Sequence, residues 1–450
     1  MSKFFLFSSN ISTDPYPVYP LGMAVVATGL KDAGHRVCQH DYLATGCSDE
    51  RLRAALLGFA PNFVGISLRN IDNVDSFAAE REWYLSETKR LVNVIRQATA
   101  APIIVGGPGF SIMPEDILDY IEADYGIVGQ GEQALCDLAA AFDQGGIVPR
   151  IVNGNRSLLN GKHMLSPCWE EDLINFYFER SGMVNLQTKR GCPHSCHYCS
   201  YPKLEGHRLR VKDPDQVVEE IKRAQRMFGV DTFFFTDSVF NDVAGHYLNL
   251  AEALLKSNLN ISWYGYFRPQ GIRAHELNLL KRSGLQAMEL GTDAASDTTL
   301  AGLNKQFTFE EVVEFNRLCV KAQIACAHFF IFGGPGETMH TVSEGLENLN
   351  RLKHSVMFAF SGIRILPDTG VHALAVREGR LAEKDSLLKP VYYFSPDIDP
   401  EVMNATIAAA FKGHRKRIFP PSEALIRMAT MNRFGFRGLL WDKLIAFNHE

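Results

Sequence analysis

The stretch RGCPHSCHYCSYPK, residues 190–203, places three cysteines within eight residues. Their spacing is C-x3-C-x2-C, and the members are Cys192, Cys196 and Cys199. Thiolates are soft ligands that select zinc, copper(I) or iron–sulfur clusters. A structural zinc ion takes four ligands, usually in two pairs, so a neighbouring histidine would have to complete such a site here. Three thiolates instead suit a [4Fe–4S] cluster in which one iron has no protein ligand.

The composition predicts a globular chain in a reducing compartment. The 450 residues are 46% hydrophobic and 22% charged, and a chain of this length suits two or three domains. The net charge of −5 gives no general attraction to nucleic acid or to an anionic membrane. Nine cysteines, six of them scattered, do not resemble a secreted disulfide framework. Because no signal peptide or spanning apolar run is visible, we expect a cytoplasmic protein without a transmembrane segment.

Residues 1–145 alternate short apolar runs with helical patterns. Five strands alternating with helices predict a doubly wound parallel α/β sheet of the flavodoxin or Rossmann type. Ligands bind such sheets at the carboxyl ends of the strands, where the loops of this chain are rich in glycine and proline. Strands are expected at 3–9, 35–42, 63–68, 102–107 and 125–129, and helices at 21–34, 51–60, 80–98, 114–123 and 132–142.

We interpret residues 146–183 as a linker and residues 184–395 as a second β/α series, followed by a helical region at 396–450. Six strands with intervening helices predict a partial (β/α)6 barrel, and the cysteines follow its first strand. These strands are expected at 184–190, 232–237, 261–268, 287–292, 325–333 and 361–366.

The cysteine motif on the loop after the first barrel strand resembles the radical S-adenosylmethionine superfamily, whose signature has the same spacing. The resemblance implies that S-adenosylmethionine binds the open iron through its amino and carboxylate groups. It also implies that an electron from the cluster releases a 5′-deoxyadenosyl radical. Cys192, Cys196 and Cys199 are then the metal ligands and the catalytic centre, and Tyr198 shields the cluster.

Further segments match the barrel of this superfamily in the same order along the chain. TFFFTD and ISWYGYFR end in an acid and an arginine where relatives contact the cofactor. MELGTDAA resembles the fourth-strand G-x-E-S segment, although its acid is a shorter aspartate followed by alanine. FGGPGET and LPDTG resemble the turns after the fifth and sixth strands. The resemblance therefore implies an S-adenosylmethionine site made of Tyr198, Asp237, Arg268, Asp293, Gly333 and Pro335.

The first domain resembles the cobalamin-binding branch of the superfamily. The segments that carry this resemblance are DPYPVYPLG after the first strand, a Ser-Leu pair after the third, GGPGF after the fourth and GQGE after the fifth. Glycines would let the backbone approach the corrin, and a serine hydroxyl would bond the buried benzimidazole. The expected cobalamin contacts are Tyr16, Tyr19, Ser67, Leu68, Arg69, Gly106, Gly107, Gly109, Phe110, Gly129, Gly131 and Glu132. A purely structural first domain is the alternative.

One departure from that branch concerns the lower ligand of the cobalt. Many cobalamin proteins carry D-x-H-x-x-G after the first strand, whereas residues 8–22 contain no histidine. Residues 41–46, DYLATG, match the string with leucine for histidine, but they follow the second strand. We therefore expect cobalamin to be base-off without a histidine ligand, with Tyr16, Tyr19 or Arg69 facing its lower side.

Two further side chains are candidates for substrate contacts. Glu205 lies in PKLEG just after the cluster loop, where a turn with solvated charges is an equally good interpretation. His328 lies on an apolar barrel strand, where a histidine is more often a hydrogen-bonded core residue.

The resemblance covers about residues 1–395 and implies a cobalamin-dependent methyltransferase. One S-adenosylmethionine would methylate cobalt, and the radical from a second would prepare an unactivated carbon for the methyl group of methylcobalamin. The substrate would be a small or lipid-type molecule, free or carrier-bound, and the reductant a protein such as flavodoxin or ferredoxin. The alternatives are a cyclase, rearrangement or oxidative enzyme without methyl transfer, and a non-catalytic cobalamin carrier or sensor. An RNA methylthiotransferase would need a second cluster, for which Cys38, Cys47 and Cys136 form no obvious set.

Overall fold

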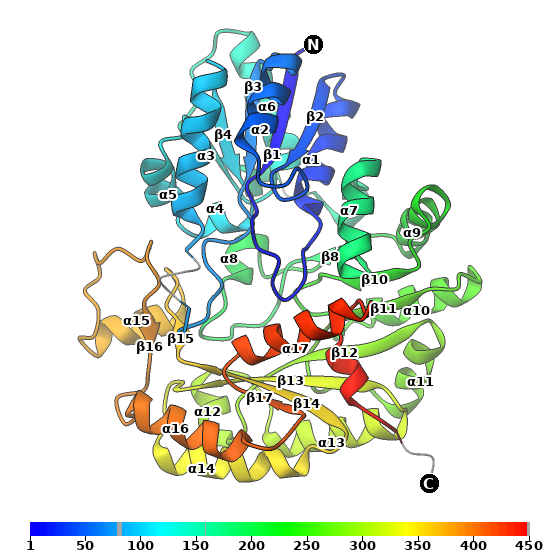
Figure 1. Cartoon of the computed structure of the whole chain (residues 1–450), viewed down its shortest axis with the longest axis vertical. Helices are drawn as coiled ribbons and strands as arrows, with labels where there is room; N and C mark the ends of the chain where they lie inside the picture. Colours follow the sequence, from blue (N-terminus) through cyan, green and yellow to red (C-terminus); the bar gives the residue numbers. More distant parts are fainter. Residues whose placement is uncertain (79–82, 158, 448–450) are drawn as a thin grey trace.

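The computed structural model describes residues 1–78, 83–157 and 159–447. It contains two large parallel sheets, the first built from the blue and cyan part of the chain and the second from the green and yellow part (Figure 1). Helices α13 (Phe309–Lys321) and α14 (Met339–Asn348) lie beneath the second sheet in this view. The first sheet and the C-terminal helix α17 (Ser422–Arg433) lie on its other side.

The first sheet has the strand order β2-β1-β3-β4-β5-β6, and all its pairings are parallel. The direction of winding changes between β1 and β3, which creates a switch point at the carboxyl ends of these strands. Its strands are β1 (Lys3–Ser8), β2 (Arg36–Asp41), β3 (Phe63–Ser67), β4 (Ile103–Gly106), β5 (Tyr125–Val128) and β6 (Ile151–Asn153). Its helices are α1 (Leu21–Asp32), α2 (Asp49–Phe59), α3 (Leu85–Ala98), α4 (Pro108–Ile112), α5 (Pro114–Ile121) and α6 (Gly131–Asp143).

The predicted doubly wound sheet is confirmed, with one strand more than the sequence indicated. The extra strand β6 comes from the region interpreted as a linker, and it pairs with β5 through only three residues. A run this short shows no alternation that a sequence pattern would reveal. The helix expected at 80–98 begins at Leu85, and residues 80–82 lie outside the described residues.

The second sheet has the order β17-β14-β13-β12-β11-β10-β7, again with parallel pairings. Because β7 and β17 end the sheet without pairing to each other, the barrel is partial, as predicted. Its strands are β7 (Val184–Leu186), β10 (Thr232–Phe235), β11 (Ser262–Phe267), β12 (Leu285–Asp293), β13 (Ala325–Phe332), β14 (Ser355–Ser361) and β17 (Arg417–Ile418). The remaining helices that cover it are α9 (Pro214–Phe228), α10 (His246–Lys256), α11 (Ala274–Arg282) and α12 (Asp297–Gly302).

The prediction of the sixth barrel strand at 361–366 was wrong in its position. The strand is β14, which ends at Ser361, because Gly362 has φ +72° and turns the chain out of the sheet. The following strand β15 (Ile363–Arg364) pairs antiparallel with β16 (Tyr392–Tyr393) instead. The other short elements are β8 (Lys189–Arg190), β9 (Arg210–Val211), α7 (Glu171–Ser181), α8 (Tyr201–Glu205), α15 (Gly370–Arg377), α16 (Pro400–Phe411), and the 3-10 helices Gly154–Ser157, Gly161–His163, Leu349–Arg351 and η4 (Trp441–Leu444).

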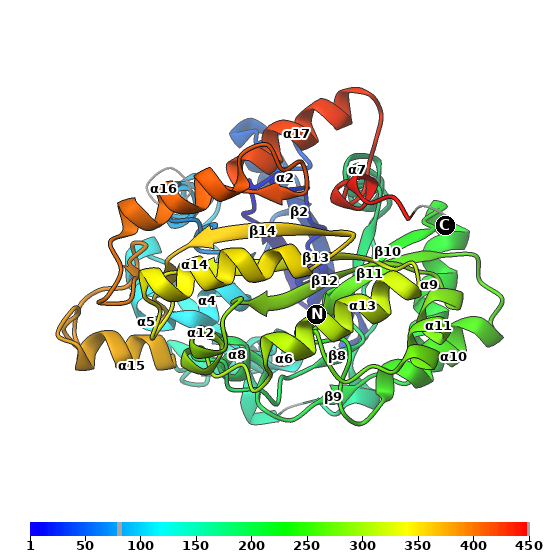
Figure 2. The ribbon, with the colours of Figure 1, turned by 90° about the horizontal axis from the view of Figure 1, so that it is seen from below.

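The two faces of the barrel sheet have different surroundings. On β12, Met288 and Leu290 pack with the surrounding helices, whereas Ala287 packs on the opposite, inner face. The C-terminal segment closes part of that inner face, and Figure 2 shows α17 on the side of the sheet away from α13. The inner cluster consists of Met183, Phe234, Tyr264, Ala287, Ala325, Ala327, Val356, Phe358, Ile418, Leu439 and Trp441. In the described residues, no helix combines the length and apolarity needed to cross a membrane.

Candidate cluster and cofactor site

The cysteine loop follows β8, which pairs with β9 outside the barrel sheet, and it is held by backbone hydrogen bonds. The amide of Cys192 donates to the carbonyl of Gly206 at 3.0 Å, and that of Cys199 donates to Cys196 at 3.1 Å. Gly191 has φ +97°, and a Cβ there would stand 2.2 Å from the carbonyl oxygen of Arg208. Only glycine fits this position, so the turn that presents the first cysteine is fixed by the chain itself.

The three motif thiols influence one another electrostatically and none is in a disulfide. Burial raises the pKa of Cys199 to about 12, and the neighbouring thiols Cys196 and Cys192 add to this rise. Thiolates that repel in this way are relieved by bound cations. Among the described residues, no three His, Cys, Asp or Glu side chains already stand in the geometry of one metal ion. Since each thiolate of a cluster binds a different iron, the trio fits the inorganic core rather than a single ion.

Two buried cations surround the cysteine loop. Arg268, at the end of β11, and Lys305, after α12, are 7% and 4% exposed. The pKa of His194 is lowered to about 4 by burial and by the charges of these two cations. A positive field suits thiolate-bound iron and a carboxylate ligand. The donor set and its charges therefore fit a [4Fe–4S] cluster with S-adenosylmethionine beside it.

Tyr198 and Asp293 come together as the sequence analysis predicted for one site. The hydroxyl of Tyr198 donates to Asp293 Oδ2 at 2.5 Å, and Lys305 forms a buried ion pair with the same carboxylate. Asp293 adopts φ +65° at the end of β12, which aims its side chain at the cysteine loop. Lys305 was missed by the sequence analysis, because nothing in its local pattern marks it. Contact of these residues with S-adenosylmethionine stays a prediction.

Asp237, just after β10, is held by hydrogen bonds within the chain. It is fully buried, and its carboxylate accepts hydrogen bonds from the amides of Thr188 and Lys189 and from the Thr188 hydroxyl. Burial raises its pKa. In this structure Asp237 fastens the strand that leads into the cysteine loop, and its contact with the cofactor stays a prediction.

The turn containing Gly333 and Pro335 is shaped by packing within the chain. Gly333 has φ +91°, and a Cβ there would stand 2.8 Å from the ring of Phe394. Buried Glu337 accepts hydrogen bonds from the amides of Gly333 and Gly334, and burial raises its pKa to about 7. The predicted contact of this turn with S-adenosylmethionine is not tested by these interactions.

The glycines of the first domain allow its loops to pack on one another. Gly107 has φ +101°, and a Cβ there would stand 2.5 Å from the carbonyl oxygen of Leu68. A Cβ on Gly109 would stand 3.1 Å from backbone atoms of both Leu68 and Arg69. Ser67, Leu68 and Arg69 therefore lie beside the Gly106–Phe110 loop at the carboxyl edge of the sheet. This arrangement brings the predicted cobalamin residues together, although their contact with a corrin stays a prediction.

The three residues predicted to face the lower side of the cobalt, Tyr16, Tyr19 and Arg69, have different surroundings in the structure. Tyr19 is 2% exposed and packs edge-on against Tyr177, so it belongs to the core. Tyr16 packs against the inner face of the barrel. The buried Nε of Arg69 has no hydrogen-bond partner among the described residues, which fits an acceptor supplied by a bound group.

The loop after β5 connects the first domain to the cysteine loop. Glu132 forms a buried ion pair with Arg190 at 2.7 Å, and Arg190 holds the pKa of Glu132 below its ordinary value despite burial. Gly129, with φ +78°, packs against Asn155, and Gly131 lies beside Val26 at the start of α6. The edge of the first sheet is thereby tied to the residue that precedes the cluster motif.

The two candidate substrate residues make hydrogen bonds within the chain, and their contact with a substrate stays a prediction. His328 is fully buried between Thr292 Oγ1 at 2.8 Å and Asn316 Oδ1 at 3.2 Å, and burial lowers its pKa to about 3. It pairs in register with Leu290, whose side chain packs toward the helices. Glu205 accepts a hydrogen bond from the amide of Gly191 and so supports the cluster loop.

The sequence analysis missed Glu289, which lies on the inner face of β12. The indole Nε1 of Trp441 donates to its Oε1 at 3.1 Å, and burial raises its pKa to about 7. The sequence does contain a sign of this residue, because Glu289 is the single acid in the apolar segment AMELG. Tyr266, in register with Glu289, is 41% exposed although it lies on a central strand.

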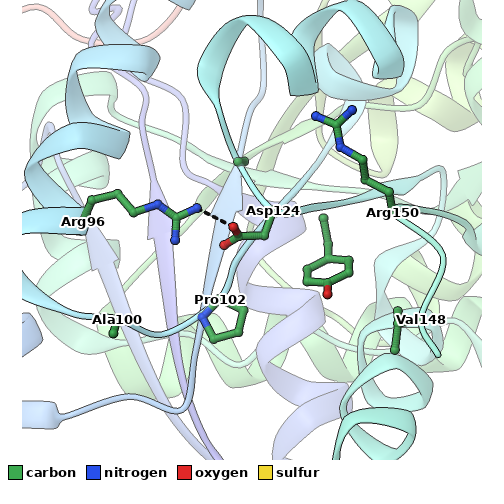
Figure 3. Close-up of a pocket in the computed structure, with 8 residues that line it drawn as sticks. Arg96, Ala100, Pro102, Asp124, Val148 and Arg150 are labelled. Atoms are coloured by element: carbon green, nitrogen blue, oxygen red, sulfur yellow. Dashed lines mark ion pairs between the residues drawn. The ribbon is translucent and has the colours of Figure 1, made fainter. Parts of the chain in front are cut away.

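A surface cavity of about 610 Å³ lies at the opposite, amino edge of the first sheet (Figure 3). Arg96 points toward Asp124, with which it pairs at 2.7 Å, while Arg150 pairs with Asp119. Both arginines are neutralised within the chain, so this cavity offers no chemistry comparable to that of the cysteine loop. Its lining residues are Arg96, Ala100, Pro102, Ala123, Asp124, Tyr125, Val148 and Arg150.

Comparison with known proteins agrees with this geometry. The Radical SAM superfamily model matches residues 186–349, and the B12 binding domain model matches residues 9–139. The chain is 25% identical over 432 residues to tryptophan 2-C-methyltransferase from Streptomyces laurentii. The aligned region covers 79% of this chain and 72% of that protein. It is 26% identical over 351 residues to anaerobic magnesium-protoporphyrin IX monomethyl ester cyclase from Rubrivivax gelatinosus, with coverage of 72% and 60%.

The fold also matches a solved structure over nearly its whole length. That structure is the radical S-adenosylmethionine methyltransferase TsrM from Kitasatospora setae with cobalamin and a [4Fe–4S] cluster bound. The TM-score is 0.85 at 24% identity, and the match covers 98% of this chain and 97% of that one. With both domain models matched in the same order, the chain belongs to the cobalamin-dependent radical S-adenosylmethionine enzymes, the family that includes these methyltransferases.

Proposed function

We propose that this enzyme transfers a methyl group from S-adenosylmethionine to a carbon atom of a small molecule held inside the barrel. The observation that carries the proposal is the direct contact between the carboxyl edges of the two sheets. Glu132 pairs with Arg190 beside the cysteines, and Asp72 after β3 pairs with Arg364 after β14 at 2.8 Å, with both side chains buried. Cofactors at the two edges would therefore share one substrate.

Different residues of the chain would have different roles in such a reaction. When bound, the cluster supplies electrons to S-adenosylmethionine, and cobalamin supplies a carrier for the methyl group. Arg268 and Lys305 provide fixed positive charge beside the thiols, and the paired Asp293 and Tyr198 border the same loop. Ion pairs across the junction hold both edges at a constant separation, which is the positioning that group transfer requires.

The methyl-transfer proposal predicts a labelled product. The anaerobically reconstituted chain should be incubated with S-adenosylmethionine carrying a deuterated methyl group and with tryptophan as the first candidate substrate, because a relative acts on it. We expect S-adenosylhomocysteine and a product that contains the labelled methyl group, both detected by mass spectrometry. A metabolite extract replaces tryptophan in a parallel reaction. Consumption of substrate without incorporation of the label would favour the cyclase, rearrangement or oxidative alternatives.

The lower face of the cobalt is proposed to have no histidine ligand. His40 lies on β2, where its ring stacks on Phe5 at 5.4 Å, and burial lowers its pKa to about 4. The loop after β1 contains no histidine, and Arg69 and Tyr16 lie at the junction instead. A base-off cobalamin without an imidazole therefore fits the side chains that surround this edge.

Electron paramagnetic resonance of the cobalt(II) form tests this arrangement. We expect a spectrum without hyperfine splitting from an axial nitrogen, because neither benzimidazole nor a protein imidazole binds below the metal. The spectrum of a His40→Gln variant should be identical to that of the original protein. Nitrogen splitting that disappears in the variant would show that His40 ligates the metal and would refute the proposal.

Two partners in this scheme rest on the family resemblance. An electron donor such as flavodoxin or ferredoxin is proposed to reduce the cluster. A lipid-type or carrier-bound substrate is also consistent with the apolar inner cluster, in which Phe329 stacks on Phe358 at 5.0 Å.

A further inference from the structure

The inner face of the barrel keeps accessible aromatic side chains above its packed floor. Tyr266 is 41% exposed, and Phe329 and Phe360 are half-buried on neighbouring central strands. Burial nevertheless raises the pKa of Tyr266, with a further rise from Glu289 and Tyr201. Tyr264 belongs to the inner cluster, so alternation along β11 places Tyr266 on the same face, and Tyr16, Phe329 and Phe360 pack against that cluster. We name Tyr16, Tyr266, Phe329 and Phe360 the aromatic wall.

Glu289 lies at the base of this wall. It is 8% exposed, it pairs in register with Tyr266 on one side and Ala327 on the other, and Trp441 holds one of its oxygens from below. The alternation of side chains puts Ala287, Glu289 and Gly291 on the inner face of β12. Ala327 and Gly291 leave space beside and above the carboxyl group, because neither has a large side chain.

The same strand leads from Glu289 to the cysteine loop. Asp293 lies four residues further on, about 13 Å at the usual rise of a parallel strand, and it contacts Tyr198 of the cysteine motif. Tyr201, two residues after Cys199, is 40% exposed and close enough to influence the pKa of Tyr266. The space between Glu289 and the cofactors therefore has an acid at one end and the cluster loop at the other.

An unpaired buried carboxyl group is costly, and Glu289 has no cation against it in the contacts described above. Burial raises its pKa to about 7, so the group is only partly ionised at neutral pH, and a hydrogen-bond donor on a ligand would favour its ionised form. The groups that face it are Tyr266 on β11, Trp441 on η4, and Tyr16 from the loop after β1, with Arg69 close to both tyrosines. Of these, only Trp441 donates a hydrogen bond to it.

We propose that Glu289 is the residue that determines substrate specificity, and that it accepts a hydrogen bond from an N–H group on a planar aromatic substrate enclosed by the aromatic wall. This inference rests on the proposed function, because it places the substrate between the barrel floor and the two cofactors. Trp441 is a positioning residue that orients the carboxyl group. Aromatic side chains favour a planar ring, and a single buried acceptor selects the molecule that carries a matching donor.

Indole and benzothiophene provide a matched pair of probes, since they share their shape and differ in the N–H donor. Binding of each should be measured by calorimetry on the reconstituted holoenzyme with S-adenosylmethionine present. We expect indole to bind about tenfold to a hundredfold more tightly, the range for a hydrogen bond to a charged acceptor. The preference should be larger at pH 8.5 than at pH 5.5, because the Glu289 carboxyl group is ionised only above a pKa of about 7. Equal affinity, or binding of neither probe, overturns the proposal.

Substitutions of Glu289 distinguish a role in ligand recognition from a role in folding. Glu289→Leu should remove the preference for indole and leave benzothiophene affinity unchanged, and Glu289→Gln should keep part of the preference without its pH dependence. Glu314→Leu is the control, because Glu314 is exposed on α13 and pairs only with its helical neighbour Arg317 in the contacts described. Should Glu289→Leu not fold, the comparison of probes on the original protein and on Glu289→Gln decides the question.

The methyl-transfer assay is run on the same preparations. Indole preference without any labelled product contradicts the proposed function and supports the role of Glu289 in recognition. Labelled product together with equal affinity for the two probes overturns the role of Glu289 alone.

Discussion

Cys192→Ala is expected to leave a folded chain that retains almost no iron or sulfide and has no methyl-transfer activity. Cys192 is one of three thiols whose mutual repulsion is relieved by the cluster, and a cubane held by the remaining two would expose a second iron. Backbone hydrogen bonds, rather than the thiol, hold the loop, so the fold should survive. Iron and sulfide analysis, with circular dichroism for the fold, measures both effects.

Cys47→Ala is the matched control for this experiment. Cys47 is an exposed thiol outside the motif, so its removal should change neither iron content nor activity. Cluster content equal to that of the original protein in Cys192→Ala would show that the motif is not the iron site. Removal of the cluster with a chelator should reproduce the loss seen in the Cys192 variant.

Asp242→Ala is expected to destabilise the barrel by about 3–5 kcal/mol, the range for an uncompensated buried charge. Asp242 pairs with Lys189 at 2.7 Å, and the side chains are 0% and 2% exposed. Lys189 also donates to the carbonyl of Phe240, and its charge lowers the pKa of the nearby buried Asp237, but Asp242 is the carboxylate that its ammonium group contacts directly. Since Lys189 immediately precedes Arg190 and the cysteine loop, iron retention should fall as well.

Urea unfolding of the full chain measures this loss, and a double variant identifies its cause. Lys189→Met combined with Asp242→Leu removes both charges of the pair and should recover part of the lost free energy of unfolding, because buried Asp237 then lacks the charge of Lys189. Glu314→Ala breaks an exposed pair and should cost less than about 1 kcal/mol. A double variant as unstable as Asp242→Ala would mean that packing, and not the charge of Lys189, accounts for the effect.

The broad architecture was readable from the sequence because both domains repeat strong local patterns. Continuous apolar strands and amphipathic helices predicted the doubly wound sheet and the partial barrel, and the cysteine spacing located the cluster loop. The position of the sixth strand was not readable, since SVMFAFS and SGIRIL are both apolar and only the turn at Gly362 separates them. The strand β6 was equally hidden, because its stability comes from pairing with β5.

The sequence predicted where the site lies better than it predicted which residues form it. Tyr198 and Asp293 were identified through motif resemblance, and they do meet in the structure. Asp237 was identified through resemblance to the family and His328 as a polar residue on an apolar strand, and both make hydrogen bonds within the chain that the sequence did not reveal. Glu289 has the same local appearance, and only the three-dimensional register places it on the inner face. Sequence patterns reveal that a polar residue is buried, whereas its partners depend on tertiary contacts.

The enclosure around Glu289 is made from segments that are far apart in the chain. Tyr16 comes from the first loop, the strands from the middle, and Trp441 from near the C-terminal end. During synthesis the ribosome releases Trp441 only after the barrel strands have emerged, so the floor of the barrel is completed last. A nascent chain that already has its cysteines therefore lacks the hydrogen bond from Trp441 to Glu289. The side chain that fixes the orientation of Glu289 is therefore synthesised long after the cysteines, and the substrate-facing side of the barrel takes its final form after the cluster loop is already present.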